Sequence, residues 1–258
     1  MIIRARMVNR TDIIASLGKG LAVIECFGPE AARLSVSQVA ELAGLDRAAA
    51  RRCLLTLQHL GYASYDGKYF ALTPRVLRLG AGALAALPLS QMVQPWLDQL
   101  SENTGQSCSV SILDNTDIVY IARAAQRRVM SIGLLPGSRL PSHCTSMGRV
   151  LLAALKDDEA ARLISASDLT PRTQFSRTDP DEILQAVRQA RVDGFAIITE
   201  EVEVGLTALA VPIRDSRSCV VAALNVGMSS HQATSDDLRQ TYLPELLKVQ
   251  KGLASILT

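Results

Sequence analysis

The sequence predicts an α+β protein of two parts, and three observations lead to this prediction. Helical periodicity that ends in an Asp-Gly hairpin signal occupies the first 73 residues, whereas strand-like runs joined by tight turns follow residue 104. The charge is also uneven: residues 1–87 hold 11 basic and 6 acidic residues, net +5, and residues 88–258 hold 16 and 19, net −3. The whole-chain charge of +2 therefore averages a basic and a slightly acidic part, which suggests two different partners.

Three helices are predicted at the start of the chain. Ser16 can cap the first, whose apolar positions recur at helical spacing: Leu17, Leu21, Ile24 and Phe27. Ser35 and Gln38 form a capping-box pattern at the start of the second helix. Gly44 can take the positive φ of a short turn, and Asp46 can then cap the third helix.

The third helix has two distinct faces. Its predicted buried stripe consists of Ala50, Cys53, Leu54, Leu57 and Leu60. The outer face near its N-terminal end consists of Arg47, Ala48, Arg51 and Arg52. Two strand-like runs around Asp66-Gly67 follow and predict a β-hairpin. Helices, turn and hairpin in this order predict a winged helix-turn-helix.

This module favours DNA as its partner. The second helix of a helix-turn-helix enters the major groove, where arginine can bond a guanine edge or neutralise a phosphate. Hydroxyls of the preceding helix, and a lysine and a tyrosine of the wing, suit phosphate contacts. The expected DNA-binding residues are Ser35, Ser37, Asp46, Arg47, Ala48, Arg51, Arg52, Lys68 and Tyr69. The alternative is a solvated basic face on a helical module that docks protein.

A linker helix is predicted next. Thr73 can cap it, Pro74 fits its first position, and Pro88 can end it. Its apolar residues surround most of the helix, so a partner must cover it. The predicted domains are therefore the winged module at residues 1–73, the linker helix at residues 74–87, and a further domain at residues 88–258.

Helices and strands alternate in the remainder of the chain. Strands are predicted over residues 107–113, 118–124, 195–199, 206–213 and 220–226, and helices over residues 91–103, 145–155 and 179–192. Ser235 can cap a closing helix. Because tight turns join the strand pairs, the pattern predicts an antiparallel sheet flanked by helices.

A loop that continues into a helix, at residues 141–149, is the candidate ligand site. The first turn of such a helix offers unpaired backbone N–H groups and the positive end of the helix dipole to an anion such as a carboxylate. Thr145 and Ser146 add hydroxyl donors, while Cys144 and Met147 can supply soft apolar walls. The alternative is an ordinary capped helix in which Gly148 serves packing alone.

Other patterns that could carry chemistry are weak. Adjacent residues in an extended loop point to opposite faces, so His143 beside Cys144 is a poor candidate for a base and its nucleophile. Glu200, Glu201 and Glu203 are predicted to lie in a solvated loop, because no histidine is near and Gly205 marks a turn. We therefore expect no catalytic residue, no metal and no cofactor.

The composition indicates a cytoplasmic protein. Five widely spaced cysteines without a Cys-x-x-Cys pair form neither a disulfide framework nor a zinc site. No apolar run of signal-peptide length precedes Asp12. Residues 79–97 carry no charge over a membrane-spanning length but contain two glycines and two prolines, so we interpret them as buried helices. The 48% apolar and 20% charged composition excludes an intrinsically disordered chain.

The chain resembles the IclR family of bacterial transcriptional regulators. The N-terminal resemblance is carried by Leu34-Ser-Val-Ser-Gln-Val-Ala40, Leu45-Asp-Arg-Ala-Ala-Ala-Arg-Arg-Cys-Leu-Leu55 and Tyr69-Phe-Ala-Leu-Thr-Pro74. The C-terminal resemblance is carried by Gly137-Ser-Arg-Leu-Pro141, Cys144-Thr-Ser-Met-Gly148, Glu200-Glu201, Gly205-Leu206 and Ala222-Ala-Leu-Asn225-Val226. Residues 46–55 and Arg127-Arg128-Val-Met130 resemble the branch that controls protocatechuate, 4-hydroxybenzoate and β-ketoadipate catabolism.

The resemblance implies a GAF-like effector-binding domain after the linker helix, and a homodimer or dimer of dimers. The family's pocket corresponds here to residues 130–140, the helix start at residues 144–147, and the late strand that holds Asn225 and Gly227. Arg123 is a candidate counter-charge for an acid, the alternative being an exposed strand-end residue. The expected effector-binding residues are Arg123, Met130, Ile132, Leu140, Cys144, Thr145, Ser146, Met147, Ala208, Asn225 and Gly227.

Together these features predict a cytoplasmic, DNA-binding transcriptional regulator. Its expected partners are a double-stranded DNA operator and a small carboxylic-acid effector from aromatic-compound catabolism, with RNA polymerase as a further candidate and no membrane. The alternative is a small-molecule-binding or hydrolytic enzyme whose N-terminal helical module docks protein. Sequence-selective DNA binding that weakens steeply with salt separates the two hypotheses.

Overall fold

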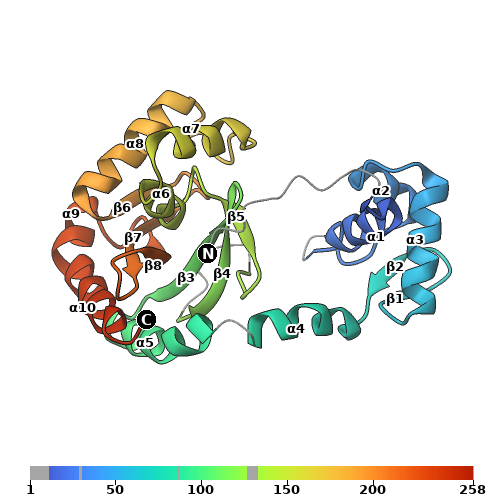
Figure 1. Ribbon diagram of the computed structural model, residues 1–258, viewed down its shortest axis with the longest axis horizontal. Coiled ribbons are helices and arrows are strands. Elements are labelled where there is room, and N and C mark those ends of the chain that lie inside the picture. The colour runs from blue at the N-terminus through green and yellow to red at the C-terminus, as the bar shows by residue number, and fades with distance from the viewer. Residues whose placement is uncertain (1–11, 29–30, 86–87, 127–132, 258) are drawn as a thin grey trace. The chain divides into compact units, whose positions relative to one another are not determined.

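The computed structural model describes residues 12–28, 31–85, 88–126 and 133–257 (Figure 1). The chain forms two compact units, Met1–Ala83 and Leu84–Thr258, and each is described by itself. The domain limits expected at residues 73 and 87 remain predictions. No helix among the described residues is long and apolar enough to cross a membrane.

The N-terminal unit contains helices α1 (Ala15–Glu25), α2 (Val36–Leu42) and α3 (Arg47–His59), followed by an antiparallel hairpin of β1 (Ala63–Tyr65) and β2 (Phe70–Leu72) (Figure 1). The capping box of Ser35 and Gln38 is present, and Asp46 Oδ1 accepts a hydrogen bond from the backbone N of Ala49 at 2.8 Å. Gly44 has a φ of 62°, so the short turn before α3 uses the left-handed conformation open to glycine. These local signals fix the helix-turn-helix as predicted.

Two predictions in this unit are wrong. Ser16 does not cap α1, because the helix already includes Ala15 and its N-cap position, Ile14, makes no side-chain cap bond. The buried side chain of α1 is Val23, whereas Leu17 and Leu21 are 61% and 48% exposed. Ile24 and Phe27, the other two residues of the periodic stripe, pack against the core, so the stripe is buried only toward its C-terminal end. Leu60, expected in the buried stripe of α3, follows the last helical residue and is 48% exposed.

The predicted linker helix begins as a 3-10 turn, Pro74–Val76, and continues as α4 (Leu77–Ala85). Thr73 accepts a hydrogen bond from the backbone N of Arg75, as a cap should. Pro88 is the first residue of the next helix, α5 (Pro88–Thr104), and so acts as a helix start. Leu77 and Leu79 of α4 are 74% and 53% exposed.

The C-terminal unit is built on a six-stranded sheet with the order β5-β4-β3-β8-β7-β6, and every neighbouring pair is antiparallel. The strands are β3 (Ser107–Asp114), β4 (Asp117–Ala124), β5 (Arg139–Pro141), β6 (Ala196–Thr199), β7 (Leu206–Arg214) and β8 (Val220–Ser229). Sequence analysis predicted all of these strands except the three-residue β5. The predicted antiparallel sheet with flanking helices is confirmed.

Helices cover both faces of this sheet (Figure 1). On one face lie α5 and α10 (Leu243–Ala254), where an added Cβ at Gly252 would lie 2.3 Å from the ring of Trp96. On the other face lies α6 (Ser146–Ala153), with α7 (Asp157–Ala166) and α8 (Pro180–Asp193) packed beyond it. Thr234, and not Ser235, caps the short helix α9 (Ser235–Asp237), which leads through a π-helical turn at Leu238–Tyr242 into α10. The sheet face under α6 holds the candidate ligand site.

Candidate functional site

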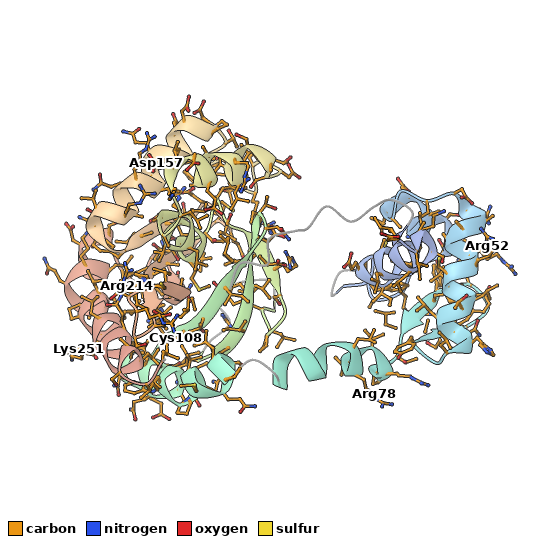
Figure 2. All side chains as sticks on the ribbon, viewed as in Figure 1. Arg52, Arg78, Cys108, Asp157, Arg214 and Lys251 are labelled. Carbon is orange, nitrogen blue, oxygen red and sulfur yellow. The ribbon has the colours of Figure 1, made fainter. Side chains whose placement is uncertain are left out.

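The outer face of α3 is basic and open to solvent. Arg47, Arg51 and Arg52 are exposed, whereas Ala50 and Leu54 on the opposite face are fully buried. Figure 2 shows Arg52 projecting away from the helix. Within the part of the chain that the structure describes, none of these three arginines has a carboxylate within ion-pair distance. Their guanidinium groups are therefore available to a phosphate or a base edge.

The wing carries a second basic group. Lys68 Nζ lies 5.0 Å from the ring centroid of Tyr69, and the Arg33 guanidinium lies 5.5 Å from the same centroid. Asp66 pairs with Arg33 and accepts hydrogen bonds from the backbone N of Lys68 at 2.9 Å and of Tyr69 at 2.8 Å. Sequence analysis missed Arg33, because its contact with the wing depends on the Leu34–Phe70 bridge, which brings distant segments together.

The structure places the predicted DNA-binding residues on the exposed face of α3, at the wing and at the starts of α2 and α3. Arg47, Ala48, Arg51 and Arg52 share the exposed face of α3, and Lys68 and Tyr69 lie at the wing. Ser35 and Asp46 are the N-cap residues of α2 and α3, and their side chains bond the helix starts. Ser37 is exposed in the first turn of α2. All of these residues lie in the N-terminal unit.

A pocket opens between the sheet and the start of α6 in the C-terminal unit. Its described lining consists of Ser107, Tyr120, Arg123, Leu134, Leu140, Thr145, Ser146, Met147, Ile198, Val202, Leu206, Ala208, Asn225 and Gly227. The empty space among these side chains is about 470 Å³, its opening to solvent included. The mixture of apolar walls with a few polar groups is typical of small-molecule sites.

Two cross-strand rows form the floor of the pocket. Ser107, Gly227, Ala208 and Ile198 follow one another across β3, β8, β7 and β6. The next row holds Arg123, Ser109 and Asn225 on β4, β3 and β8. Ala208 and Gly227 are small, and an added Cβ at Gly227 would meet only Leu206 Cδ1, at 3.9 Å. The floor is therefore open at Ala208 and Gly227, beside a row of polar groups.

An irregularity of β4 places Arg123 in this row. Successive side chains of a strand alternate between faces, so residues three apart normally face opposite sides. The register between β3 and β4 shifts at Val110 and Ser111, where Ser111 pairs with Tyr120 and Ser109 pairs with Arg123. Ile121 and Ala122 both pack into the opposite core as a result. The bulge thus brings Tyr120 and Arg123 to the pocket face together.

Arg123 is the charged group of the pocket. Its Nη1 donates to Ser109 Oγ at 2.9 Å, and no carboxylate of the described residues lies within ion-pair distance. Burial lowers the pKa of Arg123, although interactions with Tyr120 and Cys108 offset part of the effect. Since arginine stays protonated in proteins, the pocket holds a partly buried cation that an anionic ligand would stabilise.

Two polar groups that line the same pocket have no partner among the described residues. Asn225 Oδ1 is buried and has no hydrogen-bond partner among the residues that the structure describes. Ser146 is 2% exposed, and no hydrogen bond of its hydroxyl to the described residues is found. Because buried polar groups are normally hydrogen-bonded, these atoms are ready to bond a polar ligand.

The start of α6 is locked in place by its own loop. Thr145 caps the helix: its Oγ1 accepts from the backbone N of Gly148 at 3.1 Å and donates to the carbonyl O of Pro141 at 3.1 Å. An added Cβ at Gly148 would lie 2.1 Å from the carbonyl O of Ser142. Gly148 is therefore required for the close approach of α6 to the backbone of Ser142, as the packing interpretation holds. Thr145, Ser146 and Met147 line the pocket.

Most of the predicted effector-binding residues come together in this pocket: Arg123, Leu140, Thr145, Ser146, Met147, Ala208, Asn225 and Gly227. Met130 and Ile132 lie outside the described residues. Cys144 is fully buried and does not line the pocket. Leu134 lies within the expected range 130–140, and the residues that sequence analysis missed are Ser107, Tyr120, Ile198, Val202 and Leu206. Ser107 and Ile198 pair across strands with the predicted residues Gly227 and Ala208, a signal that requires the strand order.

The prediction of a solvated loop is wrong for Glu201. Its side chain is 7% exposed and forms a two-pronged ion pair with Arg149 of α6, with Nη1 to Oε1 at 2.8 Å and Nη2 to Oε2 at 2.5 Å. The carboxylate of Glu200 bonds the backbone N of Gly205 at 2.9 Å and Ser230 Oγ at 3.0 Å. The charge of Glu201 can be buried because Arg149, on a helix that is distant in the sequence, pairs with it. The local sequence does not reveal this partner.

His143 and Cys144 do not form an activated nucleophile. Burial raises the pKa of the Cys144 thiol to about 11, so the thiol stays protonated near neutral pH. Burial, and then the charge of Arg149, lowers the pKa of His143, whose Nδ1 has no hydrogen-bond partner within the described ranges. Cys144 Sγ instead lies 3.7 Å from the carbonyl O of Pro141.

Two family models match the chain. The model described as bacterial transcriptional regulator IclR C-terminal matches residues 81–253, and the IclR helix-turn-helix domain matches residues 16–67. The chain is 40% identical to the Pca regulon regulatory protein of Pseudomonas putida, over 94% of this chain and 84% of that protein.

Solved structures with similar folds include a transcriptional regulator from Rhodococcus sp. RHA1, with a TM-score of 0.79 and 42% identity over 95% of this chain and 98% of that one. Another is the inducer-binding domain of a double mutant of the transcription factor PobR from Acinetobacter, in complex with 3-hydroxybenzoic acid. It is 29% identical, has a TM-score of 0.62, and covers 65% of this chain and 98% of its own.

Proposed function

Because this chain belongs to the IclR family of bacterial transcriptional regulators, and is therefore a DNA-binding regulator, we propose that a small aromatic carboxylic acid controls it by binding beside Arg123. The observation that carries the proposal is the pocket itself, where a partly buried guanidinium faces apolar walls. The 3-hydroxybenzoic acid in the related inducer-binding domain supports an aromatic acid.

The acid's carboxylate pairs with Arg123 in this proposal. A charge-assisted bond to a guanidinium is roughly twice as strong as a neutral hydrogen bond, and the pocket supplies no competing carboxylate among the described residues. The ring lies against Ala208 and Gly227, where the floor is open. Ser146 and Asn225 then bond a ring substituent or the second carboxylate oxygen.

DNA binding is assigned to α3 and the wing. We place the N-terminal end of α3 in the major groove, with Arg47 and Arg51 toward base edges and Arg52 toward a phosphate. Ser35, Ser37, Lys68 and Tyr69 contact the backbone, while Asp46 and Ala48 position the start of the helix. The exposed arginines of α3, which have no ion-pair partner among the described residues, support this assignment.

We also propose that the chain acts in the cytoplasm as a homodimer or dimer of dimers on a pseudo-palindromic operator. Leu77 and Leu79 of α4 are exposed leucines on a helix that, by its composition, needs a partner. Two-fold protein symmetry matches the two half-sites of such an operator. RNA polymerase is a further candidate partner.

The test uses the full chain and a labelled DNA fragment taken upstream of its own and neighbouring genes. Fluorescence anisotropy should show tight binding that falls steeply between 50 and 200 mM salt, as counterion release requires. An unrelated fragment of equal length is the control. Equal affinity for both fragments contradicts the proposal.

A further inference from the structure

The ion pair of Arg149 and Glu201 lies inside the C-terminal unit. The two side chains are 3% and 7% exposed, and both oxygens of the carboxylate bond the guanidinium. Arg149 Nε has no hydrogen-bond partner in the described part of the chain. Moving two charges out of water costs free energy that their attraction only partly offsets, so such a pair says little about stability. Its position in the fold suggests a different role.

The pair joins two walls of the pocket. Arg149 lies in α6 one turn after Ser146, which lines the pocket, and Glu201 directly precedes Val202, which lines it from the loop between β6 and β7. Neither Arg149 nor Glu201 is part of the described lining. This buried contact therefore links α6 to the loop between β6 and β7. Both of these elements line the ligand space.

The loop is also held from its outer side. Side chains of a neighbouring loop bond the three successive carbonyls of residues 200–202: Thr173 Oγ1 at 2.6 Å, Ser176 Oγ at 2.7 Å and Arg172 Nε at 3.4 Å, respectively. Glu200 has a φ of 59°, a conformation that a non-glycine residue keeps only where its surroundings fix it. The wall that contains Val202 is thus a fixed structure, anchored to α6 through Glu201.

We propose that Arg149 and Glu201 are positioning residues of the effector pocket. The two-pronged pair fixes the separation between the start of α6 and residues 200–202, and it thereby sets the affinity for the effector. A site of this kind needs its lining held to within a fraction of an ångström, which two parallel hydrogen bonds provide. The inference rests on the proposed function, since it concerns the same pocket.

The first test is the double variant Arg149→Met with Glu201→Leu. It removes both buried charges, and Arg177, which also lies 3.8 Å from Glu201, is 47% exposed and stays solvated without that partner, so the fold should keep its thermal midpoint within a few degrees. Isothermal titration calorimetry with 3-hydroxybenzoate and 4-hydroxybenzoate should show a Kd raised about tenfold or more, because a misplaced wall loses ligand contacts. An unfolded fraction would lower the stoichiometry instead of raising the Kd.

A second variant keeps the test decisive if the double variant does not fold. Glu201→Asp retains the charge but shortens its reach by one methylene, so it should also weaken acid binding while DNA binding persists. The matched control is Asp157→Asn, which breaks exposed pairs to Arg188 and Arg191 on the unit's surface and should leave the Kd unchanged (Figure 2).

A folded double variant or Glu201→Asp chain with the wild-type Kd overturns this inference alone. If the wild-type chain binds neither acid, the proposed function falls and the inference falls with it. The wild-type titration therefore separates the two failures.

Discussion

At the scale of single residues, Arg123 is the feature on which the ligand proposal depends. The bulge in β4 brings it to the pocket face, and Ser109 is its side-chain hydrogen-bond partner among the described residues. Burial lowers its pKa, which means that the protein environment disfavours the charge. A bound carboxylate offsets this cost, so the site is more complementary to an acid than to a neutral ligand.

Replacing Arg123 with Met should weaken acid binding about 10- to 100-fold, which corresponds to roughly 1.5–3 kcal/mol for a hydrogen bond to a charged group. The charge is lost but the side-chain volume is nearly kept, so the thermal midpoint should change little. Calorimetric titration of 3-hydroxybenzoate measures the effect. Arg188→Met, an exposed position on α8, is the control, and equal Kd values for the two variants count against the assignment.

Two glycines provide a matched pair of substitutions. Gly227→Val extends into open space on the pocket floor, so it should block the ring and abolish acid binding while the fold is retained. Gly148→Ala places a methyl group against the backbone of Ser142 and should cost about 3 kcal/mol of unfolding free energy. Thermal unfolding and calorimetry separate the two effects. A Gly227→Val chain that binds the acid normally would show that the ligand lies elsewhere.

His143 should make the stability of the C-terminal unit sensitive to acid. Its pKa is lowered in the folded state from the ordinary value of 6.5, chiefly by burial and then by Arg149, against opposing effects of Glu201, Asp168 and Asp117. Above about pH 6.5 the imidazole is neutral in both states and contributes nothing to the pH dependence. Below it the unfolded chain binds a proton that the folded chain does not, so the free energy of unfolding falls.

Urea unfolding of the wild-type chain between pH 7.5 and 5 should therefore show a steeper loss of stability than the same series on His143→Gln. The comparison of slopes is independent of any constant destabilisation by the substitution. Parallel slopes would mean that His143 takes up its proton equally well in the folded state.

At the scale of elements, α3 and its caps are what sequence alone predicts best. The signals are local: Asp46 bonds the backbone three residues later, and Gly44 turns the chain before it. The order of strands and the bulge in β4 depend on pairing between distant residues, which one sequence does not reveal. For the same reason the burial of Glu201 against α6 was not predicted, although the helix start at Thr145 was.

The assignment of α3 leads to a test of its outer face. Arg51→Ala should cost about 1–3 kcal/mol of specific DNA binding if the guanidinium bonds a base edge, with little change for unrelated DNA. A phosphate contact would instead weaken all sequences alike and lower the salt dependence by about one ion. The matched control is Arg188→Met in the other unit, and anisotropy titrations that do not distinguish Arg51→Ala from this control would exclude Arg51 from the interface.

At the scale of the whole molecule, the net charge of +2 averages two units that have different roles. The basic exposed face belongs to the N-terminal unit, and the pocket with its single described guanidinium belongs to the C-terminal unit. A ligand controls DNA binding only if its affinity differs between DNA-bound and free states, and linkage makes the effect reciprocal. The central claim is therefore a coupling between an acid at Arg123 and DNA at α3.

The measurement that tests this claim most directly is the Kd for operator DNA with and without saturating acid, in the wild-type chain and in Arg123→Met. The account predicts that 3-hydroxybenzoate or 4-hydroxybenzoate changes the wild-type Kd about 5- to 150-fold, the usual range of such couplings, and leaves the variant's Kd unchanged. An acid that has no effect on the wild-type Kd, or the same effect on both chains, would contradict it.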